Sequence, residues 1–340
     1  MSSVLDPRMT GRYICRKSTN VTLNQLGIIA VSDRIFKAIT KDGFGRNSWE
    51  KNDLNPRGKT DQHMINWVFF VDTLNFSFWP DEGAVKFGVK DHTGKLQTGY
   101  WSLCAAVNRA LEDGIPIIEP EFMASMTLEQ LEMVLRSDTE GTIPLLVERL
   151  EAINQAGKCI MEKFSGSFTN CVMRSEKNVS TLLDIIVDNF ESYRDMCQYK
   201  NKNVSFLKRA QVLISHIWAC MDGKGLGEFT NIETLTMFAD YRVPQALVAL
   251  NVLEYSDGLK DRLKRREPMI PGDETESEIR GASIYACDEI VVRVADMARE
   301  EGEDVEVNAT LVDFFLWDWA RDNRSLVDSL PFHRCRSIYY

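Results

Sequence analysis

Residues 206–247, FLKRAQVLISHIWACMDGKGLGEFTNIETLTMFADYRVPQAL, are the most informative about the fold. Apolar residues at helical spacing predict a helix over Phe206–Met221. Alternate glycines follow from Gly223 to Gly227, which is typical of a tight connection between helices. Thr230 to Glu233 has the pattern of a capping box, so we expect another helix to begin there. The stretch therefore predicts a helix, a glycine hairpin and a second helix.

One acid, Asp240, stands near Arg242 at the end of this stretch. Pro244 disfavours helix at Val243 and suits the first turn of a following helix. We therefore expect Asp240 at a break between helices, near an N-terminal dipole that keeps it ionised. An ionised carboxylate beside a pocket can stabilise an oxocarbenium-like sugar as a glycosidic bond breaks. The structural alternative is an acid that caps the helix or pairs with Arg242.

Helical periodicity dominates the rest of the chain, and the sequence therefore predicts a mainly α protein. The clearest stripe, entered through Pro144, consists of Leu146, Leu150, Ile153, Gly157, Ile160 and Phe164. Similar patterns cover Val21–Ile39, Ser102–Asp113, Thr127–Arg136, Ser180–Asn189, Pro244–Leu253, Glu278–Arg299 and Ala309–Arg321.

One region departs from this periodicity. The stretch NWVFFVDTLNFSFW, residues 66–79, is rich in β-branched and aromatic residues. It precedes residues 85–101, in which His92–Lys95 supplies a turn. We expect a small antiparallel β-sheet inserted over residues 60–102.

We expect the chain to form a single compact unit over residues 1–340. Within it, the helical region with the helix-hairpin-helix core spans 140–260, and C-terminal helices with a docked tail span 278–340. The polar tract Lys264–Glu278 is the best candidate for an exposed loop or linker.

Composition and charge limit the function. A formal net charge of -10 argues against binding to duplex DNA or other long polyanions, which require a basic face. The eight cysteines are scattered, without the spacing of a zinc site or a disulfide framework. No leader-like segment and no long apolar run is present, so we expect a cytoplasmic protein that does not enter a membrane.

The glycine hairpin and the acid after it resemble the helix-hairpin-helix DNA glycosylases. In that family a catalytic aspartate follows the hairpin in a pattern similar to V-D-x-x-V, a place held here by Ala239–Val243.

A closer resemblance spans nearly the whole chain. It rests on WVFFVDTLNFSFW, GYWSLCAAVNRALEDGIPI, KRAQ, TMFADYR, EIRG, FLWDWA and the terminal PFHRCRSIYY. These segments are similar to the queuosine salvage proteins, which are queuosine 5'-phosphate N-glycosylase/hydrolases. The resemblance implies hydrolysis of the N-glycosidic bond of queuosine 5'-monophosphate, with queuine released for reinsertion into transfer RNA. It also implies a glycosylase-like helical fold with extra elements and neither a metal nor another cofactor, and we expect a monomer.

Carried over residue by residue, the family's catalytic aspartate falls on Asp240, and the aromatic residue that lies against the base falls on Phe238. Queuine has a cationic amine and a diol, so its pocket should offer carboxylates among aromatic side chains. The stretch LVDFFLWDWARDNR has this character, with Asp313 and Trp317 on one helical face. Asp313 and Asp318 are alternatives for the partner of the amine, and a solvated surface acid is the alternative for each.

Two aromatic segments add candidates for binding. In DTLNFSFW, strand alternation would put Phe76 and Phe78 on one side and Asn75 on the other, free to bond the ligand. The alternative for Asn75 is an amide bonded to backbone. Trp101 could line the same pocket or belong to the core.

The 5'-phosphate needs donors. Two clusters are candidates: Lys208 with Arg209, and the terminal His333, Arg334 and Arg336 with Tyr339. Arg242, close to the catalytic acid, is a further candidate for substrate binding. A solvated basic face is the alternative for each cluster.

Two departures from the related families affect the expected mechanism. Asn52 stands where the queuosine proteins often carry a histidine, and an amide cannot transfer protons near neutrality. No lysine occurs between Gly225 and Leu259, which favours simple hydrolysis over a Schiff base. The strongest rival is a non-catalytic carrier or sensor of queuine, and a DNA repair glycosylase conflicts with the negative charge.

Overall fold

The structure is a computed structural model that describes residues 4–340. It is mainly helical with small two-stranded sheets, which confirms the predicted fold class. The α-helices are α1 (Pro7–Lys17), α2 (Gln25–Asp42), α3 (Asp61–Thr73), α4 (Tyr100–Glu112), α5 (Pro120–Ser125), α6 (Leu128–Val134), α7 (Leu146–Lys163), α8 (Phe168–Met173), α9 (Val179–Asn189), α10 (Lys208–Cys220), α11 (Arg242–Ala249), α12 (Asp257–Lys264), α13 (Glu274–Glu301), α14 (Ala309–Asp322) and α15 (Arg324–Val327). The short 3-10 helices are η1 (Arg46–Lys51), η2 (Glu191–Tyr193), η3 (Gly225–Gly227) and η4 (Ile232–Thr234).

The strands form four separate pairs. The strands are β1 (Val21–Leu23), β2 (Gly88–Lys90), β3 (Leu96–Thr98), β4 (Met196–Tyr199), β5 (Lys202–Ser205), β6 (Leu253–Tyr255), β7 (Pro268–Met269) and β8 (Arg334–Cys335). β1 pairs with β6, β2 with β3 and β4 with β5, all antiparallel, whereas β7 and β8 are parallel. The β2–β3 hairpin is the one predicted around the turn at His92–Lys95.

The stretch expected to begin the β insertion is helical instead. Residues 66–73 belong to α3, whose N-cap Thr60 accepts a hydrogen bond from the His63 N–H. Every residue of α3 from Ile65 to Thr73 is buried, so packing on all sides of the helix outweighs the preference of its aromatic and β-branched residues for strands. Leu74 to Trp79 then run as a loop rather than an alternating strand, with Ser77 at a φ of 42°.

The second helix of the predicted helix-hairpin-helix, which was expected to begin at Thr230, does not form in residues 4–340. After α10, the glycine segment forms η3, and Thr230 to Glu233 leads only into the short η4. The Thr230 hydroxyl bonds to the Lys177 carbonyl instead of capping a helix. Residues 235–239 are then buried in an extended conformation, and side chains of other elements satisfy part of their backbone.

Two helix predictions included short strands. Val21–Leu23 forms β1, and α2 begins only after Asn24, whose side chain accepts from the N–H groups of Leu26 and Gly27. The Pro244–Leu253 helix ends at Ala249, before β6. The tract Lys264–Glu278 holds β7 and the first turn of α13, so only its middle is a loop.

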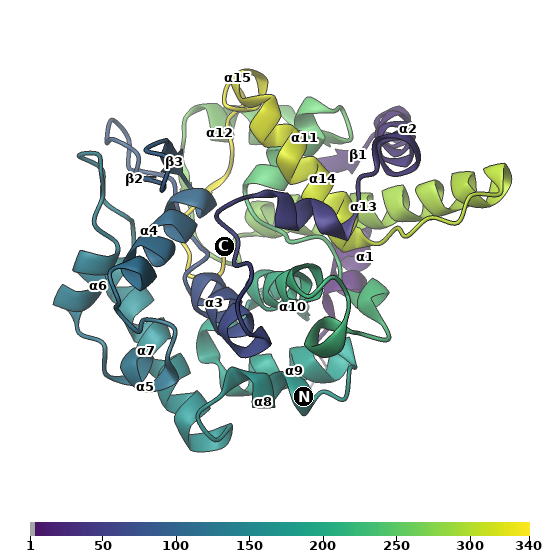
Figure 1. The fold of residues 1–340 in the computed structure, drawn as a ribbon. Helices are drawn as coiled ribbons and strands as arrows, with labels where there is room; N and C mark the ends of the chain where they lie inside the picture. The colour runs from purple at the N-terminus through teal and green to yellow at the C-terminus, as the bar shows by residue number, and fades with distance from the viewer. Residues whose placement is uncertain (1–3) are drawn as a thin grey trace.

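The buried apolar side chains form two large clusters. The first joins α3, α4, α7 and α10, and the second joins α1, α2, α11, α13 and α14. α10 runs through the middle of the molecule, with α3 beside it and α11 and α14 across from it (Figure 1). Trp317 of α14 packs against both clusters, so α14 lies where the two meet.

Among residues 4–340, no helix combines the length and apolar character that a membrane crossing requires.

Candidate active site

The extended segment Leu235–Tyr241 carries the predicted catalytic acid. Met237, Ala239 and Tyr241 are buried in the second apolar cluster. The Asp240 N–H donates to the Phe238 carbonyl at 2.7 Å, so the chain turns tightly at Ala239 just before α11. Phe238 is buried but belongs to neither of the two large apolar clusters.

The backbone of this segment is held from three directions. The Thr236 N–H donates to Gln211 Oε1 of α10 at 2.8 Å. The Phe238 N–H donates to Asp313 Oδ2 of α14 at 2.9 Å. The Ala239 carbonyl accepts from Arg280 Nε of α13 at 2.8 Å. The position of Asp240 therefore depends on three helices that are far apart in the sequence.

Asp240 is half-buried at the start of α11, as the sequence predicted. Its Oδ1 accepts from the N–H groups of Arg242 and Val243, each at 2.9 Å. No hydrogen bond from residues 4–340 reaches its Oδ2. The Arg242 guanidinium bonds instead to Gln245 Oε1 at 3.1 Å and Asp328 Oδ1 at 2.6 Å. Capping therefore occupies one oxygen of Asp240, and the expected alternative of pairing with Arg242 does not occur.

The pKa of Asp240 shifts in the direction opposite to the one expected from the helix N-terminus. Its carboxylate is desolvated by dense surroundings although part of the residue reaches solvent, and this burial raises its pKa. The Lys208 ammonium and the N–H groups of Val243 and Arg242 oppose the rise in pKa. The stabilising helix N-terminus is present, but desolvation outweighs it.

Lys208 is the basic group that acts most strongly on Asp240. It opens α10 and is buried, with Nζ donating to the Asn75 carbonyl at 3.3 Å. Burial lowers the pKa of Lys208, and the Asp240 carboxylate is the strongest influence opposing that shift. No direct ion pair joins the two side chains within the described chain.

Asp313 lies on the other side of Phe238. Burial raises the pKa of Asp313 well above that of an ordinary aspartate, and the Asp240 carboxylate adds to the rise. The Phe238 N–H opposes the rise through its hydrogen bond to Oδ2. Two buried carboxyl groups that repel each other do not both ionise readily, so Asp313 tends to keep its proton.

Aromatic rings of the same segment, α14 and α4 lie in contact with one another beside these acids. Phe238 and Phe314 have ring centroids 6.3 Å apart, and Trp317 lies 5.7 Å from Trp101 and 6.2 Å from Tyr100. Rings at such distances can stack on a planar base. Phe238 thus contacts α14 through Phe314, and Trp101 at the start of α4 contacts α14 through Trp317.

Asn75 lies among buried polar groups rather than on a strand. Its Nδ2 donates to Asp72 Oδ1 at 3.1 Å, and Asp72 Oδ2 lies 2.9 Å from His216 Nδ1. The Asn75 carbonyl accepts from Lys208. Asp72 and His216 were not among the predicted site residues; both are buried and paired with each other.

Arg209 and Arg334, two arginines of the predicted phosphate clusters, are engaged elsewhere. Arg209 donates to the carbonyls of Thr73, Ser192 and Asp72. Arg334 lies over Trp79, with its Cζ 5.6 Å from the ring centroid. Neither position leaves a guanidinium directed toward Asp240.

Arg321 is a candidate that the sequence analysis missed. Its Cζ lies 4.8 Å from the Trp317 ring centroid and 5.7 Å from that of Trp101. Burial, and then the charge of Arg324, lowers its pKa to about 10. No carboxylate within residues 4–340 forms an ion pair with it. The signal was available, because Asp313, Trp317 and Arg321 recur every four residues on one face of a helix.

Two other predicted residues lie apart from the acids. Asn52 is half-buried, and its Oδ1 accepts from the Leu54 N–H at 3.0 Å, a local turn contact. Asp318 is exposed, on a different face of α14 from Asp313. Partial desolvation and the Asp322 carboxylate raise the pKa of Asp318 to about 6.

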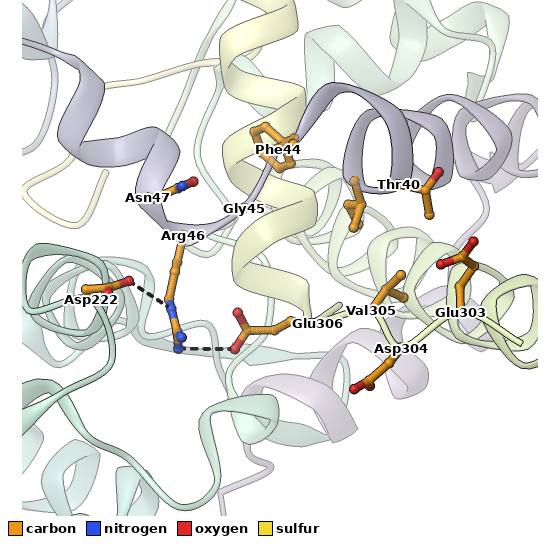
Figure 2. Close-up of a pocket in the computed structure, with 12 residues that line it drawn as sticks. Thr40, Phe44, Gly45, Arg46, Asn47, Asp222, Glu303, Asp304, Val305 and Glu306 are labelled. Carbon is orange, nitrogen blue, oxygen red and sulfur yellow. Dashed lines mark hydrogen bonds and ion pairs between the residues drawn. The ribbon is translucent and has the colours of Figure 1, made fainter.

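A cavity of about 470 Å³ lies elsewhere, between the end of α2 and the segment after α13 (Figure 2). Arg46 crosses it, bonded to Asp222 at 3.1 Å and paired with Glu306 at 3.6 Å. Its other charged lining residues, Glu303 and Asp304, are acidic. This lining would repel an anionic ligand, so a nucleotide is not its expected occupant.

Comparison with known proteins identifies the family. The family model described as queuosine salvage protein matches residues 54–340. This chain belongs to the queuosine salvage protein family. A relative from Bos taurus, named queuosine 5'-phosphate N-glycosylase/hydrolase, is 43% identical over the full length of both chains. Relatives of the same name from Nematostella vectensis and Schizosaccharomyces pombe are 37% and 36% identical, covering all of this chain and 99% and 100% of theirs.

Among residues 4–340 of this family member, no group of His, Cys, Asp or Glu residues has an arrangement that could hold a metal ion. All eight cysteines are free thiols.

Proposed function

We propose that this enzyme hydrolyses the N-glycosidic bond of queuosine 5'-monophosphate, releasing queuine and ribose 5-phosphate. The names of the full-length relatives support this substrate. The observation that carries the proposal is the Asp240 carboxylate: one oxygen is fixed by the first N–H groups of α11, and the other has no partner within the described chain.

Asp240 stabilises the sugar as the bond breaks. The bond between ribose C1' and the base nitrogen lengthens, its electron pair moves to the base, and positive charge develops on the sugar. The Oδ2 atom of Asp240 is available to face that charge, while its Oδ1 holds the side chain in place. A carboxylate already oriented in this way need not reorganise as the charge appears. Water then adds to C1' and yields ribose 5-phosphate.

Asp313 supplies the proton that the leaving base requires. Its strongly raised pKa favours the protonated carboxyl, and its Oδ1 is free of hydrogen bonds to the described residues. The proton moves to a ring nitrogen of the departing base, and the attacking water restores it. The two acids thus divide the work, Asp240 as an anion and Asp313 as an acid.

The base packs among the rings of Phe238, Phe314 and Trp317. Because Asp313 holds a proton, the cationic amine of queuine is better matched by Asp318, whose pKa of about 6 leaves it ionised at neutral pH. Trp101 and Asn75 border the same region and orient the base.

The 5'-phosphate is bound by Arg321, with help from Arg242. A partly buried guanidinium without a carboxylate partner gains most from an anionic ligand. Arg242 is close enough to lower the pKa of Arg321 and is itself half-exposed. Along α14, Asp313 thus supplies the acid, Trp317 the ring and Arg321 the cation.

Incubation of the purified protein with queuosine 5'-monophosphate tests this function. Mass spectrometry should detect free queuine in amounts that exceed the enzyme concentration. Tight binding of the nucleotide without release of base would instead indicate a carrier or sensor.

A further inference from the structure

Arg280 of α13 connects the segments that carry the two oppositely charged residues of the site. Its Nε donates to the Ala239 carbonyl at 2.8 Å, immediately before Asp240. Its Nη1 and Nη2 donate to Asp195 Oδ1 and Oδ2 at 3.0 and 2.5 Å. All of these groups are buried, and the Arg280 side chain is 3% exposed.

Asp195 extends the connection to Lys208. Its Oδ2 accepts from the Lys208 backbone N–H at 3.1 Å, at the first residue of α10. Leu207, just before it, has a φ of 51°, so the chain turns sharply into the helix at this point. One carboxylate therefore fixes both the guanidinium and the place where α10 begins.

The guanidinium is also fixed in its plane. Arg280 Cζ lies 4.0 Å from the Phe206 ring centroid and 4.2 Å from that of Tyr340. The Tyr340 hydroxyl donates to Glu276 Oε1 at 2.7 Å, and the same oxygen accepts from Arg280 Nη1 at 3.2 Å. The planar fork is held between two rings and tied at both edges, which leaves it little freedom to shift.

We propose that Arg280 and Asp195 are positioning residues that set the separation between the Asp240 carboxylate and the Lys208 ammonium. This inference rests on the proposed function, because it concerns the same reaction. Neither side chain bonds to the Asp240 carboxylate or the Lys208 ammonium. Arg280 acts through the Ala239 carbonyl, and Asp195 acts through the backbone N–H of Lys208. The pair connects α13, the extended segment and the start of α10 in one continuous set of hydrogen bonds.

The separation matters because Lys208 and Asp240 influence each other without forming a direct ion pair. A sugar that becomes cationic must face Asp240 without being displaced by the ammonium. Misplacement of a catalytic group by about 1 Å can reduce the rate by about a hundredfold. A rigid connection buried behind the two residues is a physical means of preventing such a shift.

The EIRG segment of the sequence, residues 278–281, contains two charged residues with different contacts. Glu278 accepts from the N–H groups of Thr19 and Asn20 and from the Tyr199 hydroxyl, so it holds the start of the chain against α13. Arg280 projects from the same helix toward the site. The two charged residues of one motif therefore serve different sides of α13.

The variants Arg280→Lys and Asp195→Asn test the proposal. Lysine keeps the positive charge but cannot bond Ala239 and both Asp195 oxygens at once. Asparagine keeps the size of Asp195 but has only one acceptor oxygen for three donors. We expect kcat for queuine release to fall about a hundredfold in each, with KM changed less than about threefold.

The pH profile distinguishes positioning from a structural role. Lys208 lowers the pKa of Asp240, so a displaced Lys208 should move the acid limb of kcat to higher pH. A purely structural defect would reduce the amount of active enzyme and leave that limb unmoved. Circular dichroism and thermal melting confirm that each variant is folded.

Two control variants are matched to these changes. Glu278→Gln alters the other charged residue of the EIRG segment, which contacts Thr19, Asn20 and Tyr199 rather than Arg280, and should retain kcat within about threefold. Arg262→Lys breaks a comparable pair with Asp273, which is not among the hydrogen bonds that join Arg280 to the site, and should also retain kcat.

The outcomes separate this inference from the proposed function. If the wild-type protein releases no queuine, the proposed function fails. If the wild type is active and a folded Arg280→Lys or Asp195→Asn variant keeps kcat and the acid limb of the wild type, the positioning role is overturned. Should Arg280→Lys fail to fold, Asp195→Asn decides by the same criteria.

Discussion

The backbone N–H of Phe238 donates to Asp313 Oδ2 at 2.9 Å, across 75 positions of sequence. This bond ties the ring proposed to stack on the base to the acid proposed to protonate it. Asp240 follows Phe238 by two residues. One short segment therefore carries the Asp240 carboxyl group and binds the Asp313 carboxyl group. Burial is the larger cause of the raised pKa of Asp313, and the charge of the Asp240 carboxylate raises it further.

The pH dependence of turnover follows from these two acids. Asp240 must be ionised, so kcat should rise with pH through its pKa, which burial places above the ordinary value. Asp313 must keep its proton, so kcat should fall once the pH passes its strongly raised pKa. The two limbs are properties of the coupled pair. A kcat profile from acidic to basic pH measures both.

Asp313→Asn should lower kcat by about a hundredfold to a thousandfold and remove the basic limb, because an amide cannot donate the proton. Asp296→Asn, which changes an exposed acid of α13, should keep both limbs. A basic limb that survives in Asp313→Asn assigns the proton donor to another group.

Arg321→Met should raise KM for queuosine 5'-monophosphate by about tenfold to a hundredfold, since a charge-assisted contact contributes about 1.5–3 kcal/mol. It should leave binding of the nucleoside queuosine, which lacks the phosphate, nearly unchanged. Steady-state kinetics with both compounds measure the difference. Arg299→Met is the control, because Arg299 is exposed at the far end of α13. Equal losses for nucleotide and nucleoside would place the phosphate elsewhere.

Gly27→Ala should destabilise the protein by about 2–4 kcal/mol, within the range for a severe steric change. An added Cβ would lie 2.0 Å from the Asn251 carbonyl oxygen and 2.5 Å from its carbon, and both of these neighbours are backbone atoms that cannot move aside easily. Gly258→Ala in α12 is the matched control, with nothing within 4 Å of its Cβ. It should stabilise by about 0.5–1 kcal/mol, because alanine favours helix. Urea unfolding of both variants gives the comparison.

His333 should make the fold sensitive to acid. Burial, and then the charge of Arg280, lowers the pKa of His333 from 6.5 to about 3. The unfolded chain therefore binds a proton more readily, and the free energy of unfolding should fall as the pH drops from about 6.5 toward 3. His333→Phe should reduce this slope without loss of stability at neutral pH. Unfolding curves at several pH values measure it, and an unchanged slope would contradict the assignment.

The sequence predicted best where local pattern and packing agree. The stripe from Leu146 to Phe164 is α7, because one face is buried and the other is polar. The helix over Phe206–Met221 is α10, although all of its residues are buried. The acid before Pro244 does lie at the start of α11, but Val243, where Pro244 was expected to disfavour helix, belongs to that helix. Pro244 fits in the first turn because the N–H groups there have no partner within the helix.

Long-range packing decided the features that the sequence did not reveal. Residues 66–73 have strand-like composition, yet α3 is enclosed by α7, α8 and α10, and a buried helix needs no polar face. Residues 235–239 stay extended because Gln211, Asp313 and Arg280 satisfy their backbone groups. No local pattern announces such partners. The binding roles of Asn75, Trp101, Trp317 and Asp318 remain proposals carried by the family resemblance.

The central claim is that the Asp240 carboxylate makes the glycosidic bond easier to break. Its most direct test is single-turnover release of queuine by Asp240→Asn, beside Asp6→Asn, which changes an acid that caps α1 in the same way. We predict that Asp240→Asn loses at least about a thousandfold in rate while binding the nucleotide within about tenfold of wild type. Asp6→Asn should match the wild type. Release of queuine by Asp240→Asn at a rate near that of the wild type would contradict the account.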